Sequence, residues 1–255
     1  MNVIGQFLEV SIHAPDILAS LGFYKRLGFT EQTIGDIWPH KYAVVSDGEI
    51  CIGLHEREID SPALTFVHHD LARHARSMTD RGSEFTFMQL DEDAFNELGF
   101  ADRDGHAVTM LEARTFTPPE FDTPDSLCGH CFEVSLPVRD ALRAGQFWAP
   151  LVPNLQDLRE DPTTHMRFDA GEVSIGLSES MGLNRTSLCF RCTDKNALAS
   201  LIEHEGLKHK MYPGYEGAFV ELQAPEGTTI CVFDEDFLGE SYVVDESDEI
   251  PPELQ

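Results

Sequence analysis

The chain has 255 residues, with 18 Lys and Arg against 45 Asp and Glu and a formal net charge of −27. This length favours two ordinary domains, and an apolar fraction of 42% is enough for a substantial core. A surface this negative repels phosphate backbones and anionic lipid, and no apolar run approaches the roughly 20 residues that span a bilayer, so we expect no nucleic-acid or membrane partner. The first residues lack the basic and apolar regions of a signal peptide, so we expect a cytoplasmic protein.

The first predicted elements are a strand and a helix. Residues 7–12 alternate between apolar and polar side chains, which is typical of a strand with one buried face. Asp16 stands at an N-cap position, and the helix that follows it is expected to end at Gly28. Two or three further strands follow, separated by turns such as the one at Asp47 and Gly48. The segment therefore predicts a β-α-β-β-β unit.

This unit occurs four times along the chain. Residues 8–16 (LEVSIHAPD) match 132–140 (FEVSLPVRD), and residues 48–56 (GEICIGLHE) match 171–179 (GEVSIGLSE), at offsets of 124 and 123 residues. Within each half, the N-cap aspartates recur 54 residues apart: Asp16 and Asp70, then Asp140 and Asp194. The chain is therefore a tandem duplication of paired units, and we expect an α+β fold.

The repeat also predicts the domain boundaries. Residues 1–114 form the first domain and residues 128–238 the second. Residues 115–127 contain several prolines and little periodicity, which is typical of a linker. Residues 239–255 are rich in acidic residues and are expected to form a tail.

Two motifs recur in both halves and point to a known family. The first helix ends in the pattern FY…LGF at 23–29, with a second copy, FW…L, at 147–151. Residues 101–113 and 224–235 each place a strand after a glycine-containing turn. Paired units with these motifs resemble the vicinal oxygen chelate superfamily, which includes glyoxalase I, bleomycin-resistance proteins, fosfomycin-resistance enzymes and extradiol dioxygenases. The resemblance implies that the four units pair into two U-shaped mixed sheets, with helices on the convex faces and a cleft on the concave faces.

The resemblance also implies where a metal ion would bind. Family members that hold a divalent cation place His, Gln or Glu ligands in the first and last strands of the paired units. The matching positions are Glu9, Gly53, Ala63 and Thr109 in the first domain and Glu133, Gly176, Ser187 and Cys231 in the second. Each set offers one carboxylate and, apart from Cys231, no second donor of the kind that metals prefer. We therefore expect no cofactor, with the usual metal site absent from both domains.

The strand faces opposite the predicted helices consist of small or polar side chains. In the first strand, Leu8, Val10 and Ile12 are expected to face the helices, and Glu9 points the other way. Small side chains leave room for a guest, so we expect this face to line a ligand-binding cleft. The candidate ligand-binding residues are Glu9, Ser11, His13, His55, Thr109, Glu133, Ser135, Arg191 and Cys231.

Glu9 is the candidate catalytic residue. A carboxylate in the middle of a strand is costly unless it is paired or protonated. Glu9 could therefore act as a base, or anchor a cationic or hydroxylated ligand, with His13 or His55 nearby. In the alternative interpretation, Glu9 and its counterpart Glu133 each pair with a basic group such as Arg191, or face water.

Six cysteines are expected to be reduced thiols, most of them buried. Cys128 and Cys131 have the spacing of a redox dithiol, but they lead into a predicted strand, where residues three apart point to opposite faces. Cys131, Cys189 and Cys231 share the polar face, which leaves a three-thiol metal site as an alternative.

These patterns predict a metal-free protein that binds a small organic molecule, sequestering a neutral or cationic compound as bleomycin-resistance-type proteins do. The alternative is a lyase, isomerase or dioxygenase whose divalent metal is held by Glu9, His13 and His55, or a metal-free isomerase with Glu9 as base. A third alternative is a scaffold that acts through a partner protein. We expect a monomer or a homodimer. We also expect the two halves of the chain to differ, because the second domain lacks counterparts of His13 and His55.

Overall fold

The structure is a computed structural model of the whole chain. It describes residues 3–33, 40–80, 83–91, 95–113, 126–160, 163–179, 184–212 and 218–235. The first half contains β1 (Gln6–His13), α1 (Ile17–Arg26), β2 (Thr30–Gln32), β3 (Tyr42–Ser46), β4 (Cys51–His55), β5 (Ala63–His68), α2 (Leu71–Asp80), β6 (Phe87–Gln89), β7 (Glu97–Ala101) and β8 (Ala107–Glu112). The second half contains β9 (His130–Pro137), α3 (Ala141–Trp148), β10 (Leu155–Arg159), β11 (His165–Asp169), β12 (Ser174–Ser178), β13 (Ser187–Cys192), α4 (Lys195–Glu205), β14 (His209–Lys210), β15 (Phe219–Gln223) and β16 (Thr229–Asp234).

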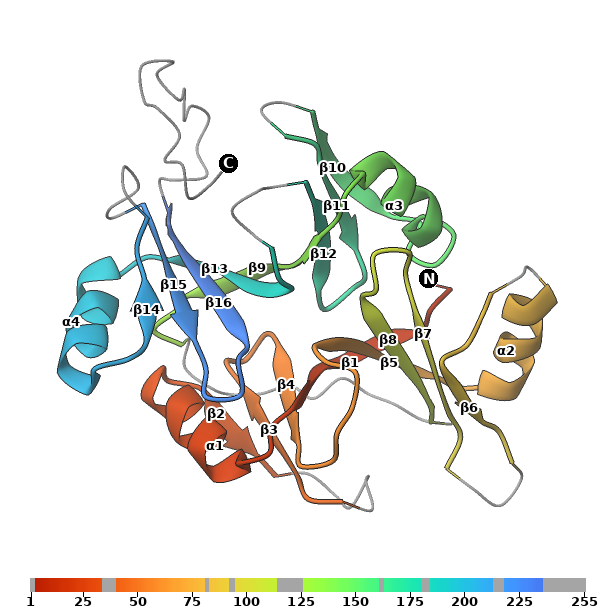
Figure 1. Cartoon of the computed structure of the whole chain (residues 1–255), viewed down its shortest axis with the longest axis horizontal. Helices are drawn as coiled ribbons and strands as arrows, with labels where there is room; N and C mark the ends of the chain where they lie inside the picture. The colour runs from red at the N-terminus through yellow and green to blue at the C-terminus, as the bar shows by residue number, and fades with distance from the viewer. Residues whose placement is uncertain are drawn as a thin grey trace.

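Each half of the chain forms one eight-stranded mixed sheet (Figure 1). The strand order is β2-β3-β4-β1-β5-β8-β7-β6 in the first sheet and β10-β11-β12-β9-β13-β16-β15-β14 in the second. At the centre of the first sheet, β1 and β5 run antiparallel, and each is parallel to the last strand of its own unit. The second sheet repeats this arrangement with β9 and β13. The predicted α+β fold of four β-α-β-β-β units is therefore confirmed.

The helices begin where the sequence predicts. The side chains of Asp16, Asp140 and Asp194 each accept a hydrogen bond from the backbone N–H three residues further on, at 3.1, 2.9 and 3.0 Å. Gly206 ends α4 in the left-handed conformation that glycine adopts at low cost. Gly82, which follows the second helix in the sequence, lies outside the described residues.

β1 departs from the predicted alternation near its start. Its register with β5 shifts between Phe7 and Glu9, which is a β-bulge. As a result Phe7 packs in the core, and the expected core residue Leu8 does not, whereas Val10 and Ile12 pack as predicted. The prediction for Leu8 was wrong because the extra residue of a bulge leaves no mark on the sequence pattern.

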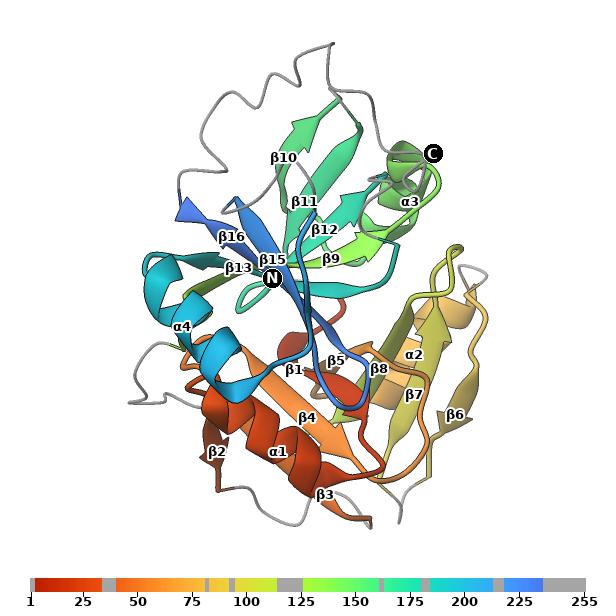
Figure 2. The ribbon, with the colours of Figure 1, turned by 60° about the vertical axis from the view of Figure 1, so that its left-hand side comes forward.

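The two halves pack through equivalent contacts at both ends of their interface. The Tyr24 hydroxyl of α1 donates to Glu226 Oε1 in the turn between β15 and β16 (2.8 Å), and Trp148 Nε1 of α3 donates to Asp102 Oδ2 in the turn between β7 and β8 (3.1 Å). Burial raises the pKa of Tyr24, and the neighbouring Glu226 raises it further, so the hydroxyl stays a donor. Accordingly α1 lies with α4 at one end of the interface and α2 with α3 at the other (Figures 1 and 2).

Most of the predicted linker and all of the predicted tail lie outside the described residues. The last linker residue, Leu127, is described, and its N–H donates to the carbonyl of Leu27 (2.8 Å). The described residues include no helix that is long and apolar enough to cross a membrane.

Candidate functional site

Glu9 lies at the centre of a buried hydrogen-bond network on the face of the first sheet away from the helices. Its side chain is 1% exposed. Ser11 Oγ (2.7 Å) and His55 Nε2 (3.0 Å) contact Glu9 Oε1, and the Tyr42 hydroxyl donates to Oε2. Ser11 also shares a hydrogen bond with Thr65 Oγ1 (2.7 Å). Three donors therefore converge on one carboxylate, which is how a buried charge is stabilised.

The small residue beside Glu9 has a specific role. Gly53 lies next to Ser11 in the parallel register of β1 and β4. A Cβ atom at Gly53 would overlap the carboxylate of Glu9, so the space that glycine leaves is filled by that side chain. The predicted room for a guest is therefore taken up at this position, and the open volume lies further along the sheet.

His55 connects the buried carboxylate to a second histidine. Its Nδ1 lies 2.9 Å from His40 Nε2. An ionised carboxylate only accepts, so in a neutral His55 ring the hydrogen is on Nε2, and Nδ1 accepts from His40. Burial lowers the pKa of His40, and His55 and Arg57 lower it further, so its ring is mainly neutral at pH 7.

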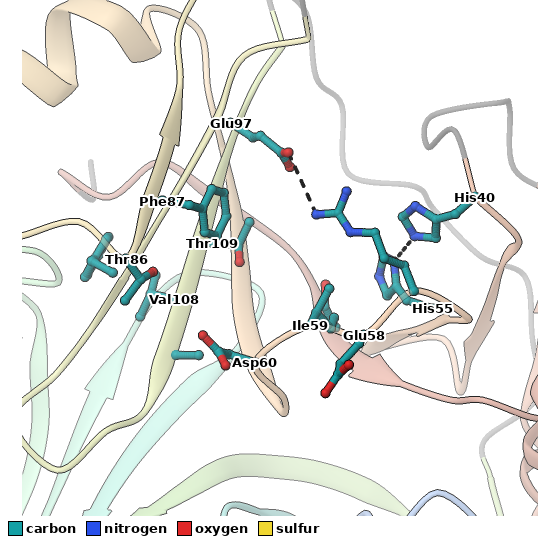
Figure 3. A pocket seen from close by; sticks show the side chains of 14 residues that line it. His40, His55, Glu58, Ile59, Asp60, Thr86, Phe87, Glu97, Val108 and Thr109 are labelled. Carbon is teal, nitrogen blue, oxygen red and sulfur yellow. Dashed lines mark hydrogen bonds and ion pairs between the residues drawn. The ribbon is translucent and has the colours of Figure 1, made fainter.

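A pocket of about 410 Å³ opens beside the two histidines (Figure 3). Phe87 of β6 and Phe100 of β7 give it an apolar side, and Thr109 of β8 offers a hydroxyl. Arg57 forms an ion pair with Glu97, with 4.0 Å between Nη2 and Oε1. The pocket thus combines an aromatic wall with polar groups that can orient a small molecule.

Most of the first-domain candidates meet at this place. Ser11, His55 and Thr109 line the pocket, and Glu9 lies behind them in the network. His13 pairs with His55 in the strand register, but no described hydrogen bond joins its side chain to the network. The second histidine of the network is instead His40.

Two participants were missed by sequence reasoning, and one register assignment has to be corrected. His40 and Tyr42 come from β3 and the residues just before it, and no spacing signal links them to Glu9. Tyr42 is found only through its cross-strand register with His55. The pairing of β5 with β1 and β8 shows that Thr65, rather than Ala63, lies opposite Glu9 and beside Thr109. Ala63 instead lies opposite Ser11, two residues further along β1.

The second domain repeats this arrangement with different partners. Glu133 is 5% exposed, and His165 Nε2 lies 3.0 Å from its Oε2. His165 occupies the register position of Tyr42, and Ser178 that of His55. Gly176 again lies beneath the carboxylate, where a Cβ atom would overlap it. The two halves therefore differ, as the sequence predicts.

The remaining second-domain candidates lie around Glu133. Cys189, rather than Ser187, is opposite Glu133, and Cys231 is the parallel neighbour of Cys189. Arg191 lies over the ring of Phe132, with 5.6 Å from its Cζ to the ring centroid, so the basic partner of Glu133 is His165 rather than Arg191. Ser135 is fully buried, and its hydroxyl has no partner among the described residues.

All six cysteines are free thiols, and four of them are buried. Burial raises the pKa of Cys51 to about 12, and it also raises the pKa of Cys131. A hydrogen bond with Cys231 and burial together raise the pKa of Cys189. Protonated thiols are poor nucleophiles and poor metal ligands. Within the described ranges, no group of three or more His, Cys, Asp and Glu side chains is arranged to hold a metal ion.

The sequence matches no protein-family model and no curated protein. Solved structures resemble the chain over most of its length. The match to catechol 2,3-dioxygenase covers 91% of this chain and 87% of the dioxygenase chain, with 14% sequence identity and a TM-score of 0.58. The Mn(II)-bound glyoxalase from Novosphingobium aromaticivorans is 11% identical, with 92% and 83% covered and a TM-score of 0.61. The 2,3-dioxygenase LapB from Pseudomonas sp. KL28 is 12% identical, with 90% and 91% covered and a TM-score of 0.58.

These similarities establish the fold. The two sheets of paired units and the full-length structural matches show that the chain has the vicinal oxygen chelate fold in its tandem two-domain form. The same fold carries different activities in different proteins, so the activity must be argued from the site.

Proposed function

We propose that the first domain binds a small neutral or cationic organic molecule in the pocket beside Glu9, His55 and His40, and that it does so without a metal ion. One observation supports this most directly. Both carboxylate oxygens of Glu9 already accept hydrogen bonds, from Ser11, His55 and Tyr42. A cation in the same place would compete with these donors.

The donor set around Glu9 also does not fit a divalent cation. The imidazole that contacts Glu9, His55, has its Nε2 against the carboxylate and its Nδ1 against His40. The neighbours of Glu9 in the row across the sheet, Thr65 and Thr109, offer only hydroxyls, and Gly53 contributes no side chain. Protein sites for transition metals use three or four imidazole, thiolate or carboxylate ligands. A sequestration site, in contrast, needs only shape, apolar surface and a few oriented polar groups.

The charges around the pocket favour a neutral or cationic guest. Three of its described lining residues are acidic, and one is arginine: Glu58, Asp60, Glu97 and Arg57. Arg57 is already near Glu97. An anion would be repelled by these carboxylates and by the net charge of −27 on the whole chain.

Binding can be tested with three probes that share one apolar body: benzylamine, benzyl alcohol and benzoate. We expect benzylamine and benzyl alcohol to raise the melting temperature of the wild type more than benzoate does. Ala107→Phe places a ring in the pocket and should abolish these shifts. Thr30→Phe puts the same side chain on the exposed edge strand β2 and should leave them intact. Equal shifts in both variants would contradict the proposed site.

Metal content is a second, independent test. We expect purified protein to contain far less than one Fe, Mn, Ni or Zn per chain, and we expect EDTA to leave both the melting temperature and the benzylamine shift unchanged. Stoichiometric metal that disappears in Glu9→Gln would overturn the metal-free assignment, whatever the outcome of the probe experiment.

The imidazole pair supports a second candidate, metal-free proton transfer. In this interpretation His40 is the base: its Nδ1 carries the lone pair, because Nε2 donates to His55, and this buried atom must turn toward the pocket to meet a substrate. Glu9 and His55 are positioning residues. A suitable probe is 5-nitrobenzisoxazole: a base removes its ring C–H proton, the N–O bond breaks, and a nitrile and a coloured phenolate form. A rate above buffer that is lost in His40→Gln would favour the enzyme. Binding of the probe without acceleration would favour sequestration.

A further inference from the structure

Two crevices lie at the ends of the interface between the two halves, and the duplication relates them. One lies between α2 and α3 and has a volume of about 670 Å³. The other, between α1 and α4, has a volume of about 450 Å³. Figures 1 and 2 show the two helix pairs at opposite ends of the molecule. The larger crevice shares one described lining residue, Phe100, with the pocket beside Glu9, and the smaller crevice shares none.

The walls of the larger crevice follow from helix periodicity. Arg143, Gln146 and Phe147 are spaced i, i+3 and i+4 on α3, so they share one face of that helix. Ser77 and Met78 face them from α2. Phe147 contacts the ring of Phe100, with 6.2 Å between centroids. The floor is therefore apolar.

Two arginines border this floor without a carboxylate partner. Arg103, in the turn between β7 and β8, and Arg143 make no ion pair with any described residue. The acidic neighbours of Arg103 have other partners: Asp102 accepts from Trp148 (3.1 Å), and Asp104 pairs with Arg139 (2.9 Å).

The local charge is opposite in sign to that of the whole chain. The described lining residues of the crevice include two arginines, Arg103 and Arg143, in a chain whose net charge is −27. Glu84 is the one carboxylate among the described lining residues of the crevice. A local excess of arginine in so acidic a protein favours an anionic guest.

The sister crevice serves as an internal comparison. The repeat places Ala19 at the position of Arg143 and Pro225 at that of Arg103. The arginine that does line the sister crevice, Arg26, pairs with Glu205 across it at 3.7 Å. The same scaffold thus balances its charge in one crevice and leaves two guanidinium groups available in the other.

We propose that the crevice between α2 and α3 binds a small organic anion, a phosphate or carboxylate carried on an apolar body. Arg103 and Arg143 hold the charged group, because a guanidinium presents paired N–H donors to such oxygens. Met78 and Phe147 contact the apolar part. This site is separate from the proposed first-domain pocket and takes a guest of opposite charge preference.

Isothermal titration with phenyl phosphate, phenol and inorganic phosphate tests the proposal. We expect phenyl phosphate to bind more tightly than either fragment, because only it reaches both the arginines and the apolar floor. Arg103→Gln and Arg143→Gln should each weaken binding about tenfold, the usual effect of losing one charge-assisted contact. Arg26→Gln, the matched change in the sister crevice, should leave the affinity unchanged.

Each remaining outcome is also decisive. Phenol binding as tightly as phenyl phosphate, or unchanged affinity in Arg143→Gln, would overturn the proposal, and so would the absence of binding by wild-type protein. Arg143 is exposed, so its replacement should leave the fold intact, and circular dichroism checks this. Ala107→Phe, which fills the first-domain pocket, should leave phenyl phosphate binding unchanged. The two proposed sites can therefore fail independently.

Discussion

Gly53→Ala is expected to lower the free energy of unfolding by about 2–4 kcal/mol, which is a large effect for a single added methyl group. The added Cβ would overlap the carboxylate of Glu9. A flexible side chain could normally move aside at little cost. Glu9 is 1% exposed and accepts from three donors, so its displacement breaks the buried network.

Urea unfolding of Gly53→Ala should be compared with that of Gly22→Ala. Gly22 lies in α1 and is exposed, and nothing lies within 4 Å of a Cβ atom placed there. Alanine in a helix interior should stabilise the protein by roughly 0.5–1 kcal/mol. If Gly53→Ala unfolds at the same urea concentration as the wild type, Glu9 is free to move and is not held by Ser11, Tyr42 and His55.

Glu9→Ala is expected to cost about 3–5 kcal/mol, because removing one partner leaves the buried polar groups of the others unsatisfied. Ser11, Tyr42 and His55 would each lose their shared acceptor. Glu9→Gln keeps the shape and one acceptor oxygen, so its effect should be smaller. The same variants should also weaken benzylamine binding if the network holds the pocket wall in place.

Glu31→Ala is the matched control for Glu9→Ala. Glu31 pairs with Lys25 at the surface, where its side chain is 44% exposed. Exposed ion pairs contribute about 0–1 kcal/mol, so urea unfolding should barely change. Similar losses in the two variants would show that Glu9 behaves as a surface carboxylate.

Much of the fold could be predicted because its signals are local and repeated. An N-cap aspartate such as Asp194 is recognised from its own helix, and Gly206 from the end of that helix. The duplication then gives every element a second copy. Consequently the order of strands and helices could be inferred without any knowledge of tertiary contacts.

The site could be predicted only in part, because its chemistry depends on pairing between strands. Glu9 and His55 were found from alternation, since both lie on the polar face of a strand. Tyr42 reaches Glu9 because β3 pairs antiparallel with β4. His40 lies just before β3 and contacts His55, which in turn contacts Glu9. The role of Gly53 was also missed, because the sequence does not show that a neighbouring side chain fills the space above it.

The shared interface also has an evolutionary consequence. The buried apolar side chains of both halves form one continuous cluster, in which Phe29 of the first half meets Phe190 of the second, with 6.0 Å between ring centroids. A half taken alone would lose this contact, so a deletion that returned the gene to a single copy would expose apolar surface such as the Phe29 ring to water. Loss of one copy is therefore expected to destabilise the copy that remains.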